Sequence, residues 1–331
     1  MSDTIRVIQY GLGPIGSAVA RHVLERKGLL LVGGVDIDPA KVGQDIGEVI
    51  AAGRALGIPV DGTLADVLQR SKADLVLHTT SSYADDCKPQ VLEILRAGLD
   101  IVSTCEELSF PWLAHAPDAA EIDAAAKKAG QTVLATGINP GFLMDSLPLC
   151  LTAICQSVDH IDVRRVQNAS LRRGPFQAKI GCGMTVEEFA ARMATGRMGH
   201  VGLRESVGMV LNTLGKELVR YEDEVKPIIA ERVIETPFCR VAPGQVAGLQ
   251  QAARAYTYEG EFMTLTFIAA LDWPENLDAI RITGRPNLEV TLQGTNGDIA
   301  TVAIAINAIR RVREAPSGLF TMRDLPIVTL W

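Results

Sequence analysis

The chain has 331 residues, of which 47% are hydrophobic and 21% charged, and its formal net charge at pH 7 is −7. This length predicts two domains of ordinary size. The acidic balance, without a basic block, excludes nucleic acid and anionic membranes as expected partners. The N-terminal stretch has no basic region followed by an apolar one, and no apolar run reaches the ~18–20 residues of a membrane span. We therefore expect a cytoplasmic protein.

The cysteines are scattered, without a CxxC pair or a Cys/His spacing typical of metal sites. They are Cys87, Cys105, Cys150, Cys155, Cys182 and Cys239. We expect reduced cytosolic thiols and no bound metal.

Strand-like and helix-like segments alternate from residue 5 to about residue 137. The predicted strands are 5–10, 29–38, 74–82, 99–104 and 131–137, and the predicted helices are 17–28, 65–73, 87–98 and 119–130. Such alternation predicts a doubly wound parallel sheet of the Rossmann type. The first domain is expected to comprise residues 1–140.

The pattern changes after this region. Residues 160–170 are strand-like, 185–199 and 203–215 are helical, and much of 224–271 and 278–294 alternates with a period of two. This alternation predicts a mainly antiparallel sheet. We expect an α+β substrate and dimerisation domain at 141–297, and a C-terminal helix and tail at 298–331 that packs back on the first domain.

A glycine-rich turn follows the first predicted strand. Gly11, Gly13 and Gly16 form the pattern G-x-G-x-x-G between a strand and a helix, the context that makes this weak motif informative. The first glycine permits the tight turn, the second lets a pyrophosphate approach, and the third lets the helix pack on the sheet. With Pro14 and Ile15, they are predicted to bind a dinucleotide.

Asp36 lies at the end of the second strand, where an acidic residue hydrogen-bonds the adenosine ribose. It favours NAD over NADP, because it would repel a 2′-phosphate. The next basic residue is Lys41, and use of both cofactors stays open. Thr79, Thr80 and Ser81 end the third core strand, where they form either a plain loop or contacts to the nicotinamide.

The stretch "VSTCEELSFP", residues 102–111, carries two adjacent carboxylates, Glu106 and Glu107. The preceding strand should end at the carboxyl edge of the sheet, so its loop should face the nicotinamide half of the cofactor. A carboxylate there could act as a general acid and base. A solvated loop is the alternative.

Several further residues are candidates for the pocket. Asn139 lies in an Asn-Pro-Gly turn after a strand and could contact the nicotinamide or the substrate, or only form the turn. Arginine in the segment 172–179 could bind a substrate carboxylate. Asp298 is expected to cap the last helix. The predicted substrate-binding residues are Phe142, Met144, Arg173, Phe176, His200 and Thr301.

The first ~145 residues resemble the dinucleotide-binding domain of the dihydrodipicolinate reductase group. The whole chain more closely resembles the family of 2,4-diaminopentanoate dehydrogenase and the native amine dehydrogenases. The segments that carry this resemblance are "YGLGPIG", "STCEELSFP", "GINPGFLMDSLP", "LRRGPFQAKIGCGMT", "GDIATVAIAINAI" and "GLFTMRDLP".

The resemblance implies a homodimeric NAD(P)-dependent amine dehydrogenase that releases ammonia. In this family, a glutamate directly after the strand that corresponds to 99–104 assists the exchange of the amine with water. Other oxidoreductases carry Glu-Lys-Pro in this loop, and by analogy with them Glu107 is the first candidate for the catalytic glutamate and Glu106 the second. The paired-histidine helix of dihydrodipicolinate reductase itself has no counterpart, since His160 stands alone.

Three alternatives remain. The enzyme could be specific for a diamino acid, it could reduce an imine or carbonyl compound without ammonia exchange, or it could be a non-catalytic cofactor sensor.

Overall fold

The computed structural model describes residues 4–196 and 198–331. The chain forms two compact units: unit 1 consists of Met1–Phe142 and Asn296–Trp331, and unit 2 consists of Leu143–Thr295. The last helix, α10 (Gly297–Glu314), therefore belongs to the same unit as the N-terminal segment.

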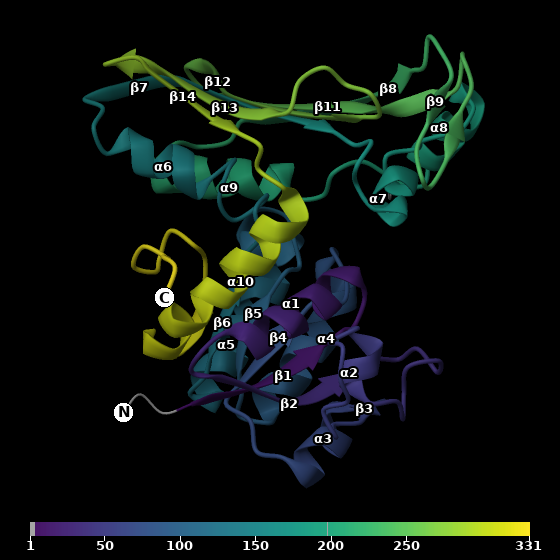
Figure 1. The fold of residues 1–331 in the computed structure, drawn as a ribbon. Coiled ribbons are helices and arrows are strands. Elements are labelled where there is room, and N and C mark those ends of the chain that lie inside the picture. The colour runs from purple at the N-terminus through teal and green to yellow at the C-terminus, as the bar shows by residue number, and fades with distance from the viewer. Residues whose placement is uncertain (1–3, 197) are drawn as a thin grey trace. The chain divides into compact units, whose positions relative to one another are not determined.

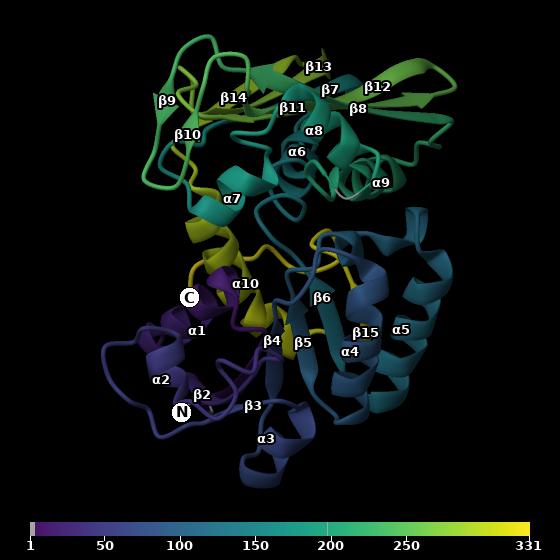
Figure 2. The same cartoon turned by 90° about the vertical axis from the view of Figure 1, so that its right-hand side faces the viewer.

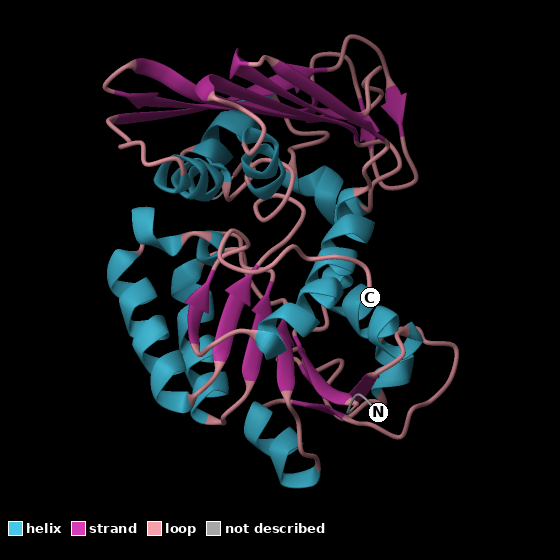
Figure 3. Cartoon of the chain, turned by 90° about the vertical axis from the view of Figure 1, so that its left-hand side faces the viewer, coloured by secondary structure: helices cyan, strands magenta, loops and turns pink. Residues whose placement is uncertain are grey.

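Unit 1 is built around a sheet of seven strands in the order β15-β6-β5-β4-β1-β2-β3. Figure 3 shows this sheet in magenta in the lower part of the picture, with helices beside it. Every neighbouring pair in this sheet is parallel. The predicted parallel sheet is confirmed, and two short strands are added to it, β3 and β15. The bounds are β1 Ile5–Tyr10, β2 Leu29–Val35, β3 Val60–Asp61, β4 Leu75–His78, β5 Asp100–Ser103, β6 Thr132–Ala135 and β15 Gly318–Phe320.

Helices cover both faces of this sheet (Figure 2). Side chains alternate along each strand, so Val7 packs with α1, α2 and α10, whereas Ile8 packs with α3, α4 and α5. The sheet is apolar on both faces, as a parallel sheet between helical layers requires. The helix bounds are α1 Pro14–Glu25, α2 Ile46–Val49, α3 Leu64–Arg70, α4 Ala84–Arg96 and α5 Ala116–Ala129, with 3-10 turns η1 Glu107–Ser109 and η2 Pro111–Leu113.

One prediction about α10 is wrong. Its N-cap is Asn296, whose Oδ1 accepts hydrogen bonds from the backbone N–H groups of Asp298 at 3.0 Å and Ile299 at 3.1 Å. Asp298 therefore lies in the first turn, where the positive end of the helix dipole stabilises its negative charge.

Unit 2 contains a sheet of six strands in the order β14-β13-β7-β12-β11-β8 (Figure 1). The β7–β12 pair is parallel and the others are antiparallel, so the sheet is mixed but mainly antiparallel. Helices α6 and α9 lie along one face (Figure 1). The sheet strands are β7 Ser157–Asn168, β8 Arg220–Ile229, β11 Val246–Thr257, β12 Gly260–Ala270, β13 Leu277–Arg285 and β14 Leu288–Gln293.

The core of unit 2 follows from the period of two along these strands. Ile161 and Val163 of β7 point to the same side and pack with Val207 and Val210 of α9. The remaining elements are α6 Ser146–Thr152, α7 Gly174–Lys179, α8 Val186–Met193, α9 Leu203–Thr213 and the small β9–β10 pair, Ile234–Glu235 and Arg240–Val241. Within the described ranges, none of the helices is long and apolar enough to cross a membrane.

Candidate active site

The strand order of unit 1 reverses between β1 and β4. From β1 the chain proceeds to β2 and β3 on one side, and from β4 to β5 and β6 on the other. The carboxyl ends of the two strands are joined there, because the Thr79 N–H donates to the Tyr10 carbonyl at 2.8 Å. Ligands of open α/β sheets bind at this kind of switch point.

The three glycines of the turn have different surroundings. Gly11 has φ +90°, and a Cβ on it would lie 2.6 Å from the Thr79 carbonyl oxygen. A Cβ on Gly16 would lie 1.9 Å from the Gly11 carbonyl oxygen, whereas one on Gly13 meets nothing within 4 Å. Gly11 and Gly16 are therefore needed by the fold itself, and Gly13 leaves open space above the turn.

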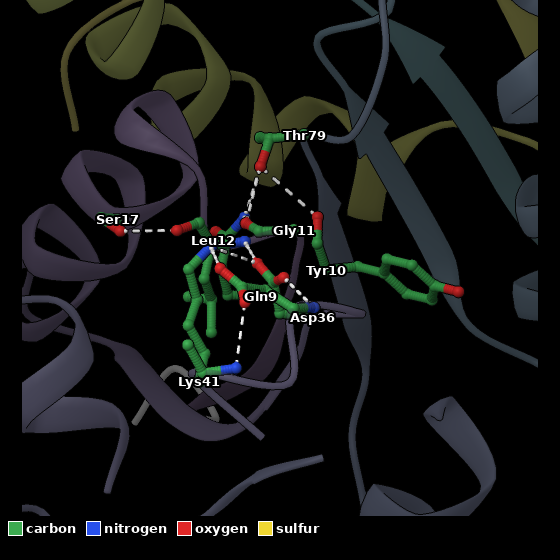
Figure 4. Close-up of polar contacts among 10 residues, drawn as sticks. Gln9, Tyr10, Gly11, Leu12, Ser17, Asp36, Lys41 and Thr79 are labelled. Atoms are coloured by element: carbon green, nitrogen blue, oxygen red, sulfur yellow. Dashed lines mark hydrogen bonds and ion pairs between the residues drawn. The ribbon is translucent and has the colours of Figure 1, made fainter. Parts of the chain in front are cut away.

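That space lies at the N-terminus of α1, which begins with Pro14 after Gly13. Among the described residues no side chain caps this helix end, so its first N–H groups remain available to an anion. Ile15 is the second residue of the helix. Figure 4 shows the turn, with the Ser17 hydroxyl donating to the Leu12 carbonyl at 3.1 Å. The turn fits the pyrophosphate of a dinucleotide.

These surroundings predict opposite results for two alanine substitutions. Gly16→Ala should lower the melting temperature, because overpacking costs about 1–3 kcal/mol. Gly13→Ala should leave the melting temperature unchanged and weaken cofactor binding about tenfold or more, because the new methyl group takes the space of the pyrophosphate. Thermal unfolding and fluorescence titration with NADH measure both. Unchanged NADH affinity in Gly13→Ala would refute the assignment of this space to the pyrophosphate.

Asp36 follows β2 and is largely buried. Its Oδ2 accepts from the Leu12 N–H at 2.7 Å and from Lys41 Nζ at 3.0 Å, and its Oδ1 accepts from the Asp38 N–H at 2.9 Å (Figure 4). Burial acts to raise the pKa of Asp36, but these hydrogen bonds and the Lys41 charge hold it below its ordinary value. The group is a carboxylate at neutral pH.

The hydroxyl groups after β4 bind other protein groups. Thr79 Oγ1 donates to the Gly11 carbonyl at 2.9 Å, Thr80 Oγ1 to Gln90 Oε1 at 2.6 Å, and Ser81 Oγ to Asp86 Oδ2 at 2.8 Å. These contacts fix the loop beside the glycine turn. They leave its nicotinamide contacts a prediction.

His78, at the end of β4, was not among the predicted site residues. It is fully buried, and burial lowers its pKa to about 4, so the ring is neutral. Its Nδ1 lies 2.9 Å from Ser103 Oγ and its Nε2 2.6 Å from Gln90 Oε1. The ring connects the ends of β4 and β5 and holds the two loops that follow them. The available signal in the sequence was a histidine directly after the apolar run at 75–77.

The two glutamates follow β5, at the same sheet edge as the glycine turn. Glu107 Oε2 accepts the backbone N–H of Ala84, the first residue of α4, at 2.7 Å. The same oxygen lies 3.2 Å from His115 Nε2. Glu107 therefore caps a helix N-terminus, which satisfies an otherwise unpaired N–H and opposes the helix dipole with a negative charge.

Glu106 precedes the turn η1 and is partly exposed. Its backbone carbonyl accepts from the Ser109 N–H at 3.1 Å. Its charge adds to the effect of burial, which raises the pKa of the Cys105 thiol well above its ordinary value. Glu106 thus follows β5 at the same sheet edge as the glycine turn and remains partly accessible.

The capping contacts of Glu107 predict a stability effect. Glu107→Gln should lower the free energy of unfolding by about 0.5–2 kcal/mol, the usual value of a lost helix cap. The exposed Glu231→Gln, in the loop after β8, is a matched control and should change stability by less than about 0.5 kcal/mol. Urea unfolding measures both. A Glu107→Gln variant as stable as the control would contradict the capping role.

A loose group of possible metal ligands lies near Glu107, although the sequence predicted none. Ligand atoms of Asp85, His115 and Asp118 lie within 4.8 Å of one another. Lys88 Nζ is 2.7 Å from Asp118 Oδ1. This cation already pairs with Asp118 and would repel a metal ion, so we assign no metal here.

Two more predicted residues belong to this edge of unit 1. Asn139 is buried in the turn after β6, with a cis Asn139–Pro140 bond, and Phe142 ends the segment half-buried. Thr301 Cγ2 lies 4.0 Å from a Cβ built on Gly137. The first turn of α10 therefore lies beside the 137–141 turn.

The other predicted substrate residues lie in unit 2. Met144 is fully buried in the hydrophobic core. Arg173 occupies the N-cap position of α7, and Phe176 lies under the Arg172 guanidinium at 4.1 Å. His200 stacks on Phe267 with ring centroids 4.6 Å apart.

Arg165 of β7 was missed by the sequence analysis. Its side chain and that of Asp278 are almost completely buried, and Arg165 Nε lies 3.7 Å from Asp278 Oδ1. Neither Nη atom of Arg165 has a hydrogen-bond partner among the described residues. Buried guanidinium groups are normally fully paired, so this cation can accept an anionic partner.

The glycine turn, the buried carboxylate of Asp36 and the polar loops at one sheet edge define an oxidoreductase with a dinucleotide-binding Rossmann unit. The model of the 2,4-diaminopentanoate dehydrogenase C-terminal domain matches residues 142–331. The chain belongs to the 2,4-diaminopentanoate dehydrogenase family.

Its relatives are similar over nearly the full length. A 2,4-diaminopentanoate dehydrogenase of Acetoanaerobium sticklandii is 31% identical, over 98% of this chain and 94% of the relative. An amine dehydrogenase of Streptomyces virginiae is 25% identical, over 98% and 96%. The solved structure of an amine dehydrogenase from Mycobacterium smegmatis superposes with a TM-score of 0.89 at 27% identity, covering 99% of this chain and 97% of that one.

Proposed function

We infer that the chain is an NAD(P)-dependent amine dehydrogenase, which oxidises a primary amine to a carbonyl compound and releases ammonia. The cofactor supplies the hydride chemistry. The overall reaction converts one protonated primary amine, one NAD⁺ and one water into one carbonyl compound, one NADH, one ammonium ion and one proton. The observation that carries this function is the pair of glutamates at the carboxyl edge of a dinucleotide-binding sheet, in a chain of this family.

Glu106 is the acid–base group of the proposal, and Glu107 holds the loop. The capping contacts of Glu107 support this order, which reverses the one expected from loop analogy. Glu106 would pair with the cationic amine and accept its proton before hydride leaves the carbon. It would release this proton to solvent, then take a proton from the water that attacks the iminium and pass it to the departing ammonia.

A substrate carboxylate is supported by unit 2 considered by itself. The Nη atoms of Arg165, buried and without partners in the described structure, support this, because a carboxylate accepts two parallel hydrogen bonds from a guanidinium. A diamino acid meets both requirements. A plain alkyl amine would leave the two Nη groups without acceptors in the described structure.

The remaining parts of the proposal concern the cofactor and the assembly. Asp36 supports NAD, through its position after β2. A homodimer, implied by the resemblance to the family, would use the sheet face of unit 2 opposite its helices, where Asp162, Arg164, Thr264 and Thr266 are partly exposed. The six free cysteines support a reducing, cytoplasmic compartment. Light scattering after size exclusion measures the dimer directly.

Reductive turnover tests the proposed reaction. Purified protein, NADH and excess ammonium are mixed with 2-amino-4-oxopentanoate, simple aldehydes or simple ketones, and nicotinamide absorbance is followed. We expect NADH oxidation that requires ammonium and is fastest with the carboxylate-bearing ketone. Turnover that is independent of ammonium would identify an imine or carbonyl reductase instead. Tight NADH binding without any turnover would identify a sensor.

A further inference from the structure

The surroundings of Asp36 bear on which cofactor the protein accepts. An acidic residue at this position normally receives the ribose hydroxyls of NAD and repels the 2′-phosphate of NADP. Here a lysine of the following loop contacts that carboxylate: Lys41 Nζ is 3.0 Å from Asp36 Oδ2 (Figure 4). It is also 3.7 Å from Asp38 Oδ2. This contact changes both the charge and the hydrogen-bonding capacity of the ribose site.

The hydrogen-bonding capacity of Asp36 is largely used within the protein. A carboxylate offers about four acceptor positions. Three are taken by the Leu12 N–H, the Asp38 N–H and Lys41 Nζ. About one remains for a ribose hydroxyl, whereas binding both hydroxyls would require two. Lys41 thus competes directly with the second ribose hydroxyl.

The charge of the site is also changed. Asp36, Asp38 and Lys41 together carry −1 rather than the −2 of the two carboxylates alone. The Lys41 side chain is 27% exposed and that of Asp36 only 10%, so the lysine is the more accessible member of the pair. An ammonium has three N–H donors. A phosphate at the ribose 2′ position can therefore bind Lys41, which would give up its contact with the more exposed Asp38 and keep the one with Asp36.

We propose that Lys41 determines cofactor selectivity, by pairing with Asp36 and receiving the 2′-phosphate, so that the protein accepts NADP as well as NAD. This inference rests on the proposed function only in its choice of a nicotinamide cofactor. Asp36 remains the ligand of the NAD ribose, and Lys41 turns a site that rejects the extra phosphate into one that tolerates it.

Binding of adenosine fragments tests the proposal without turnover. Titration calorimetry compares 5′-AMP with adenosine 2′,5′-bisphosphate, which differ only by the 2′-phosphate. In the unchanged protein we expect affinities within about tenfold of each other. Lys41→Gln should weaken the bisphosphate about tenfold or more, equal to about 1.4 kcal/mol, and change 5′-AMP less than threefold. Lys41→Arg should retain bisphosphate binding, and added salt should weaken the bisphosphate more than 5′-AMP.

Lys128→Gln, an exposed lysine of α5, is the control for net charge and should change neither affinity. Asp36→Asn should strengthen the bisphosphate relative to 5′-AMP. An affinity ratio that Lys41→Gln leaves unchanged within threefold, including equal losses for both fragments, would overturn the proposal. Because no amine is present, failure of the amine dehydrogenase assay and failure of this test are separate results.

Discussion

Glu106→Gln should lower kcat for reductive amination about 10²–10⁴-fold, the usual contribution of a positioned acid–base group. Glutamine keeps the size and polarity of the side chain but can neither accept the proton of the amine nor carry the charge that pairs with it. NADH binding should be unchanged, because the glycine turn and Asp36 are untouched. The measurement is initial-rate kinetics with saturating NADH and ammonium, beside a fluorescence titration of NADH.

Glu107→Gln is the matched variant for this experiment, since it removes the same charge one residue away. Its kcat should fall far less, and its loss should appear in the free energy of unfolding. Reversed results, with kcat lost only in Glu107→Gln, would show that the helix-capping carboxylate is the catalytic one. Kinetics below the melting temperature of both variants separates the two effects.

Much of unit 1 could be predicted from the sequence, because its signals are local. Apolar strand segments alternate with amphipathic helices, and the glycine turn lies between one strand and one helix. The strands β3 and β15 escaped prediction because two or three residues show no period. The cap of α10 was misplaced by two residues because Asn296 and Asp298 are both good capping residues.

The two glutamates show where local signals end. Their position after β5 could be predicted, since every parallel strand in such a sheet ends at the same edge. Their separate roles could not be predicted, because the role of Glu107 depends on its contacts with the Ala84 N–H and with His115. The Ala84 contact spans 23 residues of sequence. A contact that depends on tertiary packing produces no periodic pattern in the sequence.

Arg165 was predictable in principle. Ile161 and Val163 are spaced by two on the buried face of β7, and the same period places Arg165 on that face. Two adjacent arginines, Arg164 and Arg165, obscured the pattern, since one faces out and the other in. A charged residue in the inward register of a strand is a direct pointer to a buried ligand or ion pair.

Arg165→Met should lower kcat/KM for a carboxylate-bearing substrate by roughly 10–100-fold, because hydrogen bonds to a charged group contribute about 1.5–3 kcal/mol. Its effect on a plain ketone should be small. The single variant should also lose about 3–5 kcal/mol of stability, because Asp278 is then a buried carboxylate without its cation.

Stability and substrate binding are separated by a second substitution. Arg165→Met with Asp278→Leu removes the buried pair as a whole, so most of the lost stability should return, while the preference for the carboxylate should not. The pH dependence supplies an independent sign. Burial raises the pKa of Asp278, so the folded state binds the proton more tightly than the unfolded chain. Stability therefore falls as pH rises from the pKa of Asp278 in the unfolded chain through its higher pKa in the folded protein. Removing the Arg165 charge should steepen this fall in the single variant and leave none of it in the double variant.

If the double variant is stable and still prefers the carboxylate-bearing ketone, Arg165 serves the fold and not the substrate. Comparison of kcat/KM for that ketone and for an uncharged ketone of equal length, in the unchanged protein and the double variant, decides between these roles. The expected result is a preference that disappears, because a buried guanidinium aligned with two acceptor atoms discriminates against a ligand that leaves its hydrogen bonds unmade.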